Sequence, residues 1–348
     1  MIVSHSVLLY FFIKDRYMSF MDNIGIEGQA QRVGILPLQG FALLSYASTA
    51  EPFRAANLHA QRPIYEVINL SIDGGPVKSS GAAAIQDVIK ISSAPKLDML
   101  FVVAGGDPVR FADRNVLRWI ARMARTTPII GGVSGGPVVL AKSGIMEGRR
   151  MTVHWEHAAA LAEISPNLAI ERSLYVIDRG RVTCAGGTAP MDLIHALISQ
   201  QHGGTFARLV SDWFLHTEIR PSGGQQRGGL VARLGTTNRA IIDAVDVMES
   251  HVADPLTLTQ LSQVAGVGSR QLNRLFKTEL GKSTMLFYRR LRLDKARNLL
   301  QNSPLHLTEI ALATGFANSS HFSRAYSDYF GTAPSTDRIQ LARYHLLP

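Results

Sequence analysis

The C-terminal part of the chain contains the same pattern of residues twice. The segment LTQLSQVAGVGSRQLNRLFKTELG (258–281) aligns with LTEIALATGFANSSHFSRAYSDYFG (307–331). Matched pairs before the turn are 49 residues apart and those after it are 50 apart, so the second turn has one extra residue. The pairs are Thr259/Thr308, Leu261/Ile310, Gly266/Gly315, Leu272/Phe322, Arg274/Arg324, Phe276/Tyr326 and Gly281/Gly331.

Each copy predicts a short helix, a turn at glycine and a second helix that starts at a polar cluster, which is the helix-turn-helix plan. The second helix of such a unit enters the major groove of DNA with its N-terminal residues on base edges. Arg and Gln can read guanine and adenine bidentately, whereas Ser and His make weaker contacts. The predicted DNA-binding residues are Ser269, Arg270, Gln271, Arg274 and Lys277 in the first copy, and Asn318, Ser319, Ser320, His321, Ser323 and Arg324 in the second.

The apolar residues of the two copies predict a packed inner face. The segment YRRLRLDKARNLL (288–300) is expected to form the long connecting helix, and on it Arg289, Arg290 and Arg292 either lie near phosphates or cap the packing. Two units on one rigid connector could reach successive major grooves, about 34 Å apart. The predicted inner-face residues are Leu261, Val264, Leu272, Leu275, Phe276, Ile310, Leu312, Phe322 and Tyr326.

The charge distribution agrees with a polyanionic partner for this part of the chain. Residues 251–348 hold twelve Lys and Arg against six Asp and Glu, which is six of the nine net positive charges. A basic segment of this kind indicates a nucleic-acid partner. On charge alone, a solvated basic surface is an equally good explanation.

The preceding part alternates short apolar runs with helical patterns, which predicts a parallel, doubly wound sheet. The segment RPSGGQQRGG (220–229) has linker composition. The predicted fold is therefore an α/β domain with a mostly parallel sheet, followed by an all-α domain with two helix-turn-helix units. The predicted parts are an extension (1–31), the α/β domain (32–218), a linker (219–236) and the helical domain (237–348), and the expected strands are 32–37, 65–70, 98–103, 127–133, 174–177 and 181–184.

Several classes of protein are disfavoured by composition. The single cysteine, Cys184, excludes an intramolecular disulfide framework, and no Cys/His cluster has zinc-ligand spacing. The apolar run Val7–Ile13 is too short to span a bilayer and lacks the features of a signal peptide, and translation could start at Met18 or Met21. We therefore expect a cytoplasmic protein with no membrane segment, metal or cofactor.

The C-terminal domain resembles the AraC/XylS family of transcription regulators. The segment SHFSRAYSDYFGTAPSTDR is similar to the C-terminal signature of that family, and the resemblance covers about residues 237–338. It implies a DNA-binding domain with two helix-turn-helix units. The residues that match the signature are Phe322, Arg324, Tyr326, Gly331 and Pro334.

The N-terminal domain resembles the class I glutamine amidotransferase-like, or PfpI-like, superfamily over about residues 32–215. Three segments carry the resemblance: VVAGGD (102–107), GGVSGGPVVLAKSGIMEGRRMTVHW (131–155) and TCAGGTAPMDLIHALI (183–198). Glu51 matches the acidic residue that lies near the catalytic cysteine in many relatives. The resemblance implies a ligand site formed by Glu51, Gly105, Gly106, Ser134, Gly135, His154, Trp155, Gly187 and Thr188.

Ser134 occupies the position of that cysteine, and Gly132–Gly136 also matches G-x-S-x-G, the turn that presents a hydrolase serine. A serine hydroxyl needs a positioned general base to act as a nucleophile. The nearby candidates for this base are His154 and His157, and Asp178 or Asp192 could orient one of them. Alternatively, the order Ser134, Asp178, His195 would mimic a hydrolase triad. The interpretation we favour is a ligand pocket in which the Ser134 hydroxyl and the following N–H groups act as donors.

Two further residues have alternative interpretations. Trp155 offers either an aromatic face for a cationic amine or ordinary packing. Cys184 is either a small packed residue or a redox sensor. The segment DWFLH (212–216) is expected to pack the last helix of the domain or to contribute to a dimer interface.

Together these features predict a ligand-responsive, DNA-binding transcription regulator rather than an enzyme. The family resemblance implies activation of genes for amino-acid or amine catabolism. The expected partners are double-stranded DNA with paired half-sites, an amino acid or quaternary amine as effector, a second copy of the chain, and RNA polymerase for an activator. The alternatives are an amidase or esterase that uses Ser134, and a constitutive DNA-binding protein whose first domain only dimerises.

Overall fold

The computed structural model of the chain describes residues 29–344, and the side chains of residues 29–340. These residues form two compact units. The first unit contains the described residues up to Gly105, with 113–153 and 173–224, and the second contains 106–112, 154–172 and the chain from Gln225 onward. Most of the predicted extension lies outside the described residues, and so do Val7–Ile13, Met18 and Met21.

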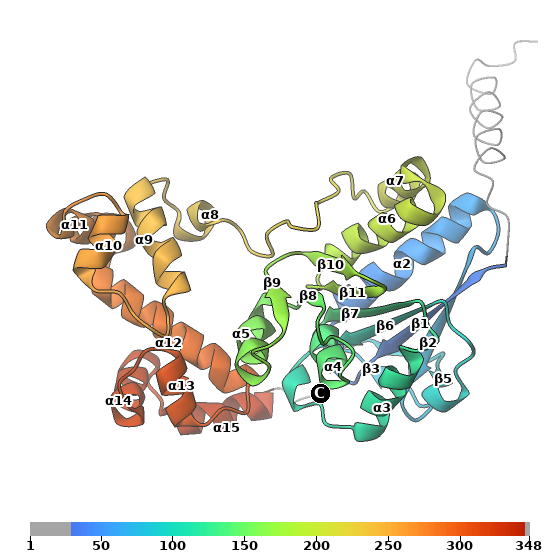
Figure 1. The fold of residues 1–348 in the computed structure, drawn as a ribbon, viewed down its shortest axis with the longest axis horizontal. Helices are drawn as coiled ribbons and strands as arrows, with labels where there is room; N and C mark the ends of the chain where they lie inside the picture. The colour runs from blue at the N-terminus through green and yellow to red at the C-terminus, as the bar shows by residue number, and fades with distance from the viewer. Residues whose placement is uncertain (1–28, 345–348) are drawn as a thin grey trace, which may run out of the picture. The chain divides into compact units, whose positions relative to one another are not determined.

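The first unit is built on a seven-stranded sheet with the order β10-β11-β7-β6-β1-β2-β5 (Figure 1). All neighbouring pairs are parallel except β10 and β11. The prediction of a mostly parallel sheet is confirmed. The strands are β1 (Gln31–Pro37), β2 (Tyr65–Ser71), β5 (Ile89–Lys90), β6 (Met99–Ala104), β7 (Ile129–Ser134), β10 (Tyr175–Asp178) and β11 (Arg181–Cys184).

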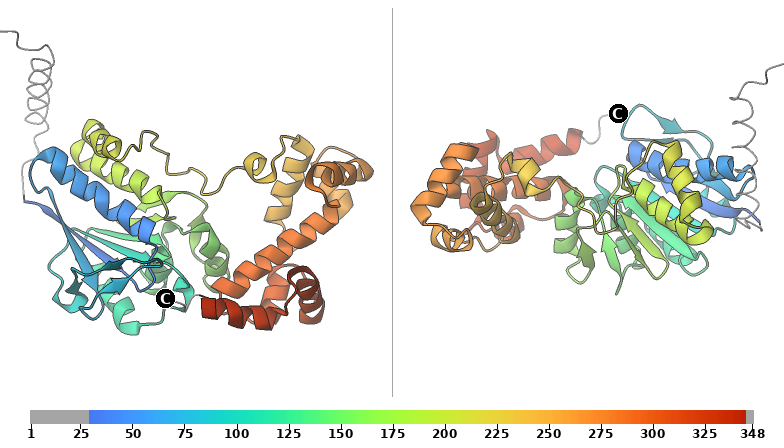
Figure 2. Two further views of the ribbon diagram at one scale, coloured as in Figure 1. Left: turned by 180° about the vertical axis from the view of Figure 1, so that it is seen from behind. Right: turned by 90° about the horizontal axis from the view of Figure 1, so that it is seen from above.

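Helices cover both faces of this sheet (Figure 1, Figure 2). On one face α2 (Leu43–Ala60), α6 (Ala189–His202) and α7 (Gly204–Trp213) pack together. On the other lie α3 (Arg114–Met123) and α4 (Gly136–Lys142). Buried side chains from alternating strand positions meet the helices, which is the pattern of a central sheet covered on both faces. Large buried side chains on the α2 face are Tyr65 and Phe101 from the strands, Phe53 from α2 and Phe206 from α7.

Short elements complete the description of the α/β part. All six predicted strands of the main sheet are present, whereas the two- and three-residue strands carry too few residues to show a periodic pattern. These are β5 of the main sheet together with β3 (Val77–Lys78), β4 (Ala84–Ile85), β8 (Arg150–Thr152) and β9 (Ala169–Glu171). The remaining α-helix in this part of the sequence is α5 (Trp155–Ile164), and two 3-10 helices cover Ile91–Ser93 and Pro108–Arg110.

The C-terminal chain is helical throughout and shows the predicted repeat. The first helices of the two copies are α10 (Leu258–Val264) and α13 (Leu307–Ala313), and the second helices are α11 (Ser269–Leu280) and α14 (Ser319–Phe330). The long connecting helix is α12 (Thr284–Asn302). The other helices are α8 (Leu230–Leu234), α9 (Arg239–Ser250) and α15 (Pro334–Tyr344).

Matching local signals explain why the two copies fold alike. Capping boxes start α10, with Thr257 and Gln260, and α13, with His306 and Glu309. The turn of each copy contains a glycine with positive φ, Gly266 (65°) and Gly315 (71°). Each second helix also ends at a glycine in the left-handed conformation.

Two of the predicted inner-face residues are exposed. Leu312 is 59% exposed because it lies two residues after buried Ile310, about 200° around the helix. Val264 is exposed because it is the last residue of α10. The remaining predicted residues are buried, apart from half-buried Leu275.

The predicted linker is shorter than 219–236. The carbonyl oxygen of Ser222 accepts a 2.9 Å hydrogen bond from the backbone N–H of Leu174, so the chain is still held to the α/β domain there. Leu230 and Leu234 of α8 pack on the core of the helical domain. Only the residues between these two anchors remain as connecting chain.

Candidate functional site

The strand-turn-helix predicted around Ser134 is present. Ser134 ends β7 with φ of 60°, the residue is 6% exposed, and α4 begins at Gly136. A non-glycine residue in this conformation is strained, and such strain is concentrated at functional sites. Within the described residues, no hydrogen bond is formed by the Ser134 hydroxyl. The turn therefore holds a buried hydroxyl that is available to a ligand.

The flanking glycines make this sharp turn sterically possible. A Cβ on Gly132 would lie 2.6 Å from the nitrogen of Pro137, and one on Gly136 would lie 2.0 Å from the carbonyl oxygen of Val102. No side chain fits at either position. Gly105, at the end of the neighbouring strand β6, is equally restricted, because its Cβ would lie 2.5 Å from the carbonyl oxygen of Gly40.

The sequence analysis predicted the backbone N–H of Gly135 as a hydrogen-bond donor to a ligand, but this group already has a partner in the chain. It donates a 3.0 Å hydrogen bond to the carbonyl oxygen of Ala104, which joins the turn to β6. The Gly135 N–H is therefore not available to a ligand, whereas the Ser134 hydroxyl still is.

The loop before α6 contacts the Ser134 turn. A Cβ on Gly186 would lie 2.7 Å from Cβ of Ser134 and 2.9 Å from Oγ of Ser45. The backbone N–H of Gly187 donates a 2.8 Å hydrogen bond to the same Ser45 oxygen. Gly187 therefore lies at the predicted site. Thr188 follows it, and its hydroxyl accepts a hydrogen bond from Arg220.

Ser45 is a site residue that the sequence analysis missed. It lies on α2, is buried, and contacts the loop that packs on Ser134. The spacing of polar residues in the sequence could have indicated it. Ser45, Ser48 and Thr49 occur at i, i+3 and i+4, which places them on one face of the helix, and all three are buried. Glu51, which was predicted for this role, pairs instead with Arg54 at 2.6 Å and is 43% exposed.

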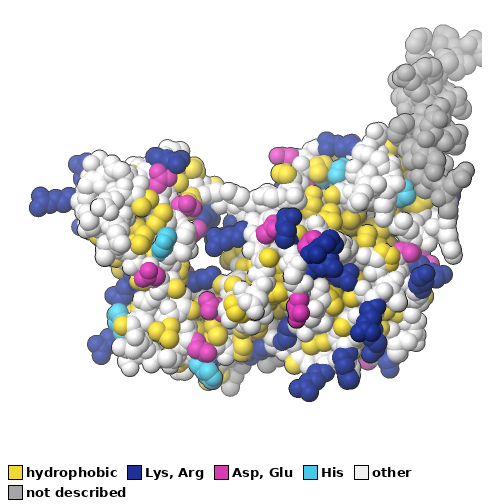
Figure 3. Space-filling model, in the orientation of Figure 1, with side chains coloured by type: hydrophobic (Ala, Val, Ile, Leu, Met, Phe, Trp, Pro, Cys, Tyr) yellow, Lys and Arg dark blue, Asp and Glu magenta, His cyan; other side chains and the backbone are white. Residues whose placement is uncertain are grey.

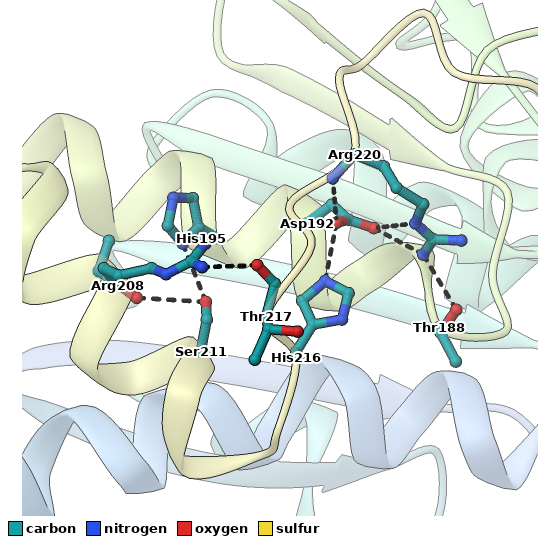
Figure 4. A network of polar contacts seen from close by, with 9 residues as sticks. Thr188, Asp192, His195, Arg208, Ser211, His216, Thr217 and Arg220 are labelled. Carbon is teal, nitrogen blue, oxygen red and sulfur yellow. Dashed lines mark hydrogen bonds and ion pairs between the residues drawn. The ribbon is translucent and has the colours of Figure 1, made fainter.

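The residues proposed for a hydrolase triad have other partners. Asp178 accepts hydrogen bonds from the Arg179 side chain and the Arg150 backbone, and these hold the pKa of its carboxyl at about 2. The His195 ring lies 2.9 Å from Oγ of Ser211. Asp192 is buried and binds His216 and Arg220 (Figure 4). The predicted order Ser134, Asp178, His195 therefore does not form a triad.

Cys184 is a packed residue. It is fully buried in the core of the first unit, and burial raises the pKa of its thiol to about 12. A redox-sensing cysteine needs thiolate character and solvent access. Neither condition is met.

Gly106, His154 and Trp155 fall in the second compact unit. His154 caps α5 by accepting from the backbone N–H of Glu156, and burial lowers the pKa of its ring. The Trp155 ring has the Arg227 guanidinium 4.6 Å from its centroid. The aromatic face predicted for a cationic ligand therefore already carries a cation from the chain.

The predicted DNA-contacting side chains lie on the second helices of the two copies. On α11, Arg270, Gln271, Arg274 and Lys277 are exposed, and Lys and Arg side chains project from this part of the molecule (Figure 3). On α14 the exposed residues are Ser320, His321 and Arg324, whereas Ser319 and Ser323 are half-buried. The first copy therefore offers three cations to DNA and the second offers one arginine.

Two predicted DNA-binding residues have structural roles in the helical domain. Asn318 caps α14, with its side-chain oxygen accepting a 2.8 Å hydrogen bond from the backbone N–H of His321. Oγ of Ser269 lies 3.0 Å from Oγ of Ser262, which links α11 to α10. These contacts orient the second helices, as N-caps and interhelical hydrogen bonds do.

The Arg292 side chain on α12 covers the turn of the second helix-turn-helix unit and does not face outward. Its guanidinium donates to the carbonyl oxygens of Thr314 and Gly315 at 2.8 and 2.7 Å, and lies 4.4 Å from the ring centroid of Phe316. Of the two alternatives for this arginine, the structure therefore shows capping. Arg289, one turn earlier, is exposed.

Between residues 29 and 344, no group of three His, Cys, Asp or Glu side chains is arranged to hold a metal ion. In the same range no helix combines the length and the apolar character that crossing a membrane requires.

Two known families match different parts of the sequence. Residues 31–200 match the DJ-1/PfpI family, and residues 261–340 match a helix-turn-helix domain. The first range contains the Ser134 turn, and the second contains α11 and α14.

Relatives with both parts are named as transcription regulators. The HTH-type transcriptional regulator GlxA of Rhizobium meliloti is 42% identical over 309 residues, which cover 88% of this chain and 95% of the relative. The HTH-type transcriptional regulator CdhR of Pseudomonas aeruginosa is 40% identical over 313 residues, covering 90% and 93%. A ThiJ/PfpI family protein from Pseudomonas syringae shares the fold, with a TM-score of 0.50 and 19% identity over 68% of this chain and 91% of that chain.

Proposed function

Because the chain belongs to the family of HTH-type transcriptional regulators that join a DJ-1/PfpI domain to an AraC-type helix-turn-helix domain, we propose that it is a regulator whose DJ-1/PfpI domain binds a small effector. The observation that carries this proposal is the pair of repeated units, each with a second helix that exposes base-reading side chains. Arg and Gln on α11 are suited to guanine and adenine in the major groove.

The two units contribute unequally to DNA binding in this proposal. Arg270, Arg274 and Lys277 give α11 both bidentate readout and phosphate attraction. On α14, Arg324 is the exposed cation, beside Ser320 and His321. The first unit therefore supplies most of the sequence preference and salt dependence, and the second unit sets the position of the site along the duplex.

The effector binds at the Ser134 turn in this proposal. The support is a strained, buried serine whose hydroxyl forms no hydrogen bond within the described residues, next to a second buried hydroxyl on Ser45. Hydroxyls that are free to donate or accept suit a carboxylate. An amino acid or a quaternary amine with a carboxylate is the class of effector we propose.

The domain binds this effector without chemical conversion. Asp178, Asp192 and His195, which could have formed a charge relay, bind other residues, and the His154 ring caps α5. A serine without an activating base is a weak nucleophile. The serine therefore serves as a hydrogen-bonding group, and a regulator of this type must release its ligand unchanged.

Effector binding acts on DNA through a dimer in this proposal. Two chains place their helix-turn-helix units on paired half-sites, and the effector shifts the equilibrium between arrangements of the two chains. The shift is limited by the difference in effector affinity between the arrangements. Activation through RNA polymerase, at genes of amino-acid or amine catabolism, is the regulatory outcome we propose.

The test is thermal stabilisation of the purified full chain by amino acids, betaines, carnitine-like amines and polyamines. An effector at 100 times its dissociation constant stabilises the folded state by about 2.7 kcal/mol. We expect a compound that raises Tm and is recovered unchanged. A compound that is consumed would instead support a hydrolase, and a panel without any stabilising member would support constitutive DNA binding.

A further inference from the structure

A fully buried carboxylate lies on α6 close to the effector site. The Asp192 side chain has no exposed surface, and it accepts four hydrogen bonds (Figure 4). A buried carboxylate is strongly destabilising unless such partners are present. The position of its donors is therefore tightly constrained.

All four donors come from the chain that leaves the domain. Nε2 of His216 and the backbone N–H of Arg220 donate to one oxygen of Asp192 at 2.8 and 2.9 Å. Nε and Nη2 of Arg220 donate to the other oxygen at 2.9 and 2.6 Å. We call residues 216–224 the anchored segment, because Ser222 also accepts a hydrogen bond from Leu174 and the first compact unit ends at Gly224.

The same arginine reaches the effector site. Nη2 of Arg220 donates a 3.0 Å hydrogen bond to the Thr188 hydroxyl (Figure 4). Thr188 ends the loop Ala185–Thr188, here called the glycine loop, in which Gly186 packs on Ser134 and Gly187 donates to Ser45. One guanidinium therefore contacts the glycine loop and the buried anchor at the same time.

We propose that Arg220 is a positioning residue that couples the effector site to the anchored segment. It holds the glycine loop against the Ser134 turn through Thr188, and it holds the start of the interdomain connection through Asp192. This inference rests on the proposed function, since it assigns a route by which effector occupancy reaches the DNA-binding domain.

The geometry implies coupling in both directions. An effector that moves the glycine loop changes the Thr188–Arg220 hydrogen bond, and the guanidinium cannot shift without disturbing the donors of Asp192. A coupling free energy is reciprocal, so a change in the anchored segment must alter effector affinity by the same factor. The glycine loop, Arg220 and Asp192 form a contiguous hydrogen-bonded network, which is one physical route for such coupling.

Hydrogen exchange of the full chain tests the coupling without a known effector. Peptides that contain the glycine loop and the anchored segment are compared between the wild type and Arg220→Gln. We expect at least about tenfold faster exchange in both peptides, because amide protection reports local opening. The control is Arg118→Gln, which removes an exposed arginine on α3 that bonds to Asn115, and it should change neither peptide.

Faster exchange in the anchored segment alone, with an unchanged glycine loop, would overturn the proposal, because Arg220 would then be a plain anchor. Thr188→Val covers the case in which Arg220→Gln does not fold. It removes one hydroxyl and keeps the Asp192–Arg220 pair, and we expect faster exchange in the anchored segment at unchanged Tm. Unchanged exchange there would also overturn the proposal.

A second measurement separates this inference from the proposed function. Glycine betaine and L-arginine are added to the wild type, and a compound that binds should slow exchange in the anchored segment and bind at least tenfold more weakly to Arg220→Gln. Binding without slower exchange there contradicts the coupling and leaves the proposed function standing. Coupled exchange in the variants, with no stabilising compound in the wider panel, contradicts the proposed function and leaves the coupling standing.

Discussion

Nε of Arg292 donates a 2.8 Å hydrogen bond to the carbonyl oxygen of Thr314, which joins the connecting helix to the turn of the second helix-turn-helix unit. The turn is also closely packed against the segment before α10, because a Cβ on Gly315 would lie 2.6 Å from Cδ of Pro255. Arg292 therefore stabilises the turn that precedes α14.

Arg292→Met should destabilise the second unit by about 1–3 kcal/mol, because the partly buried carbonyl oxygens of Thr314 and Gly315 lose their charged donor. We expect a lower Tm and loss of footprint protection on the DNA contacted by α14, with protection by α11 retained. Arg289→Met, which replaces an exposed arginine on the same helix, is the matched control for stability. Equal loss of protection by both second helices would contradict the assigned role.

The arginine and the lysine of α11 should differ in their effect on DNA binding. Arg274→Ala should weaken specific binding by about 1–3 kcal/mol and relax the preference at one base pair, if the side chain reads guanine. Lys277→Ala should weaken binding to all sequences similarly and reduce the salt slope by about one. Binding titrations at several salt concentrations distinguish the two effects, and identical behaviour of the two variants would contradict the predicted register of α11.

The Ser134 hydroxyl should contribute to effector affinity and not to chemistry. Ser134→Ala should weaken effector binding about tenfold, which corresponds to one hydrogen bond of about 1.4 kcal/mol. Hydrolysis of a p-nitrophenyl ester should be the same in wild type and variant. Turnover that disappears in Ser134→Ala would show that the serine is a nucleophile.

The buried thiol predicts a specific pH dependence of stability. Burial raises the pKa of Cys184 to about 12, above the value of about 8.5 for an exposed thiol. The protonated thiol therefore stabilises the folded state fully below about pH 8.5, and this contribution is lost as the pH rises toward 12. The Tm difference between wild type and Cys184→Ala should shrink between pH 8.5 and 10.5. A constant difference, or rapid reaction of the folded protein with a thiol reagent, would contradict burial of this side chain.

Local patterns predicted the fold well because they repeat or alternate. The six main strands are apolar runs bounded by breakers, and the two helix-turn-helix copies share caps and turn glycines such as Gly266 and Gly315. The predictions that Leu312 and Val264 lie on the inner face were wrong. The helices α13 and α10 have only two turns each, and so short a periodic pattern cannot define which face is buried.

The site could be predicted only in part, because its remaining contacts are tertiary. The turn at Ser134 follows from the glycines around it. The choice between Ser45 and Glu51 depends on which side of α2 faces the turn, and small or apolar residues occur on all sides of that helix. Asp192 and Arg220 are 28 residues apart, and no local pattern indicates that they meet.

Selection of binding sites from a random DNA library by the full chain tests the central claim most directly. We expect enriched sequences with two boxes about one helical turn apart, and Arg274→Ala should change the preferred bases in one box only. Salt-sensitive binding without any enriched sequence would contradict the account, because the two exposed second helices would then bind phosphates without reading bases.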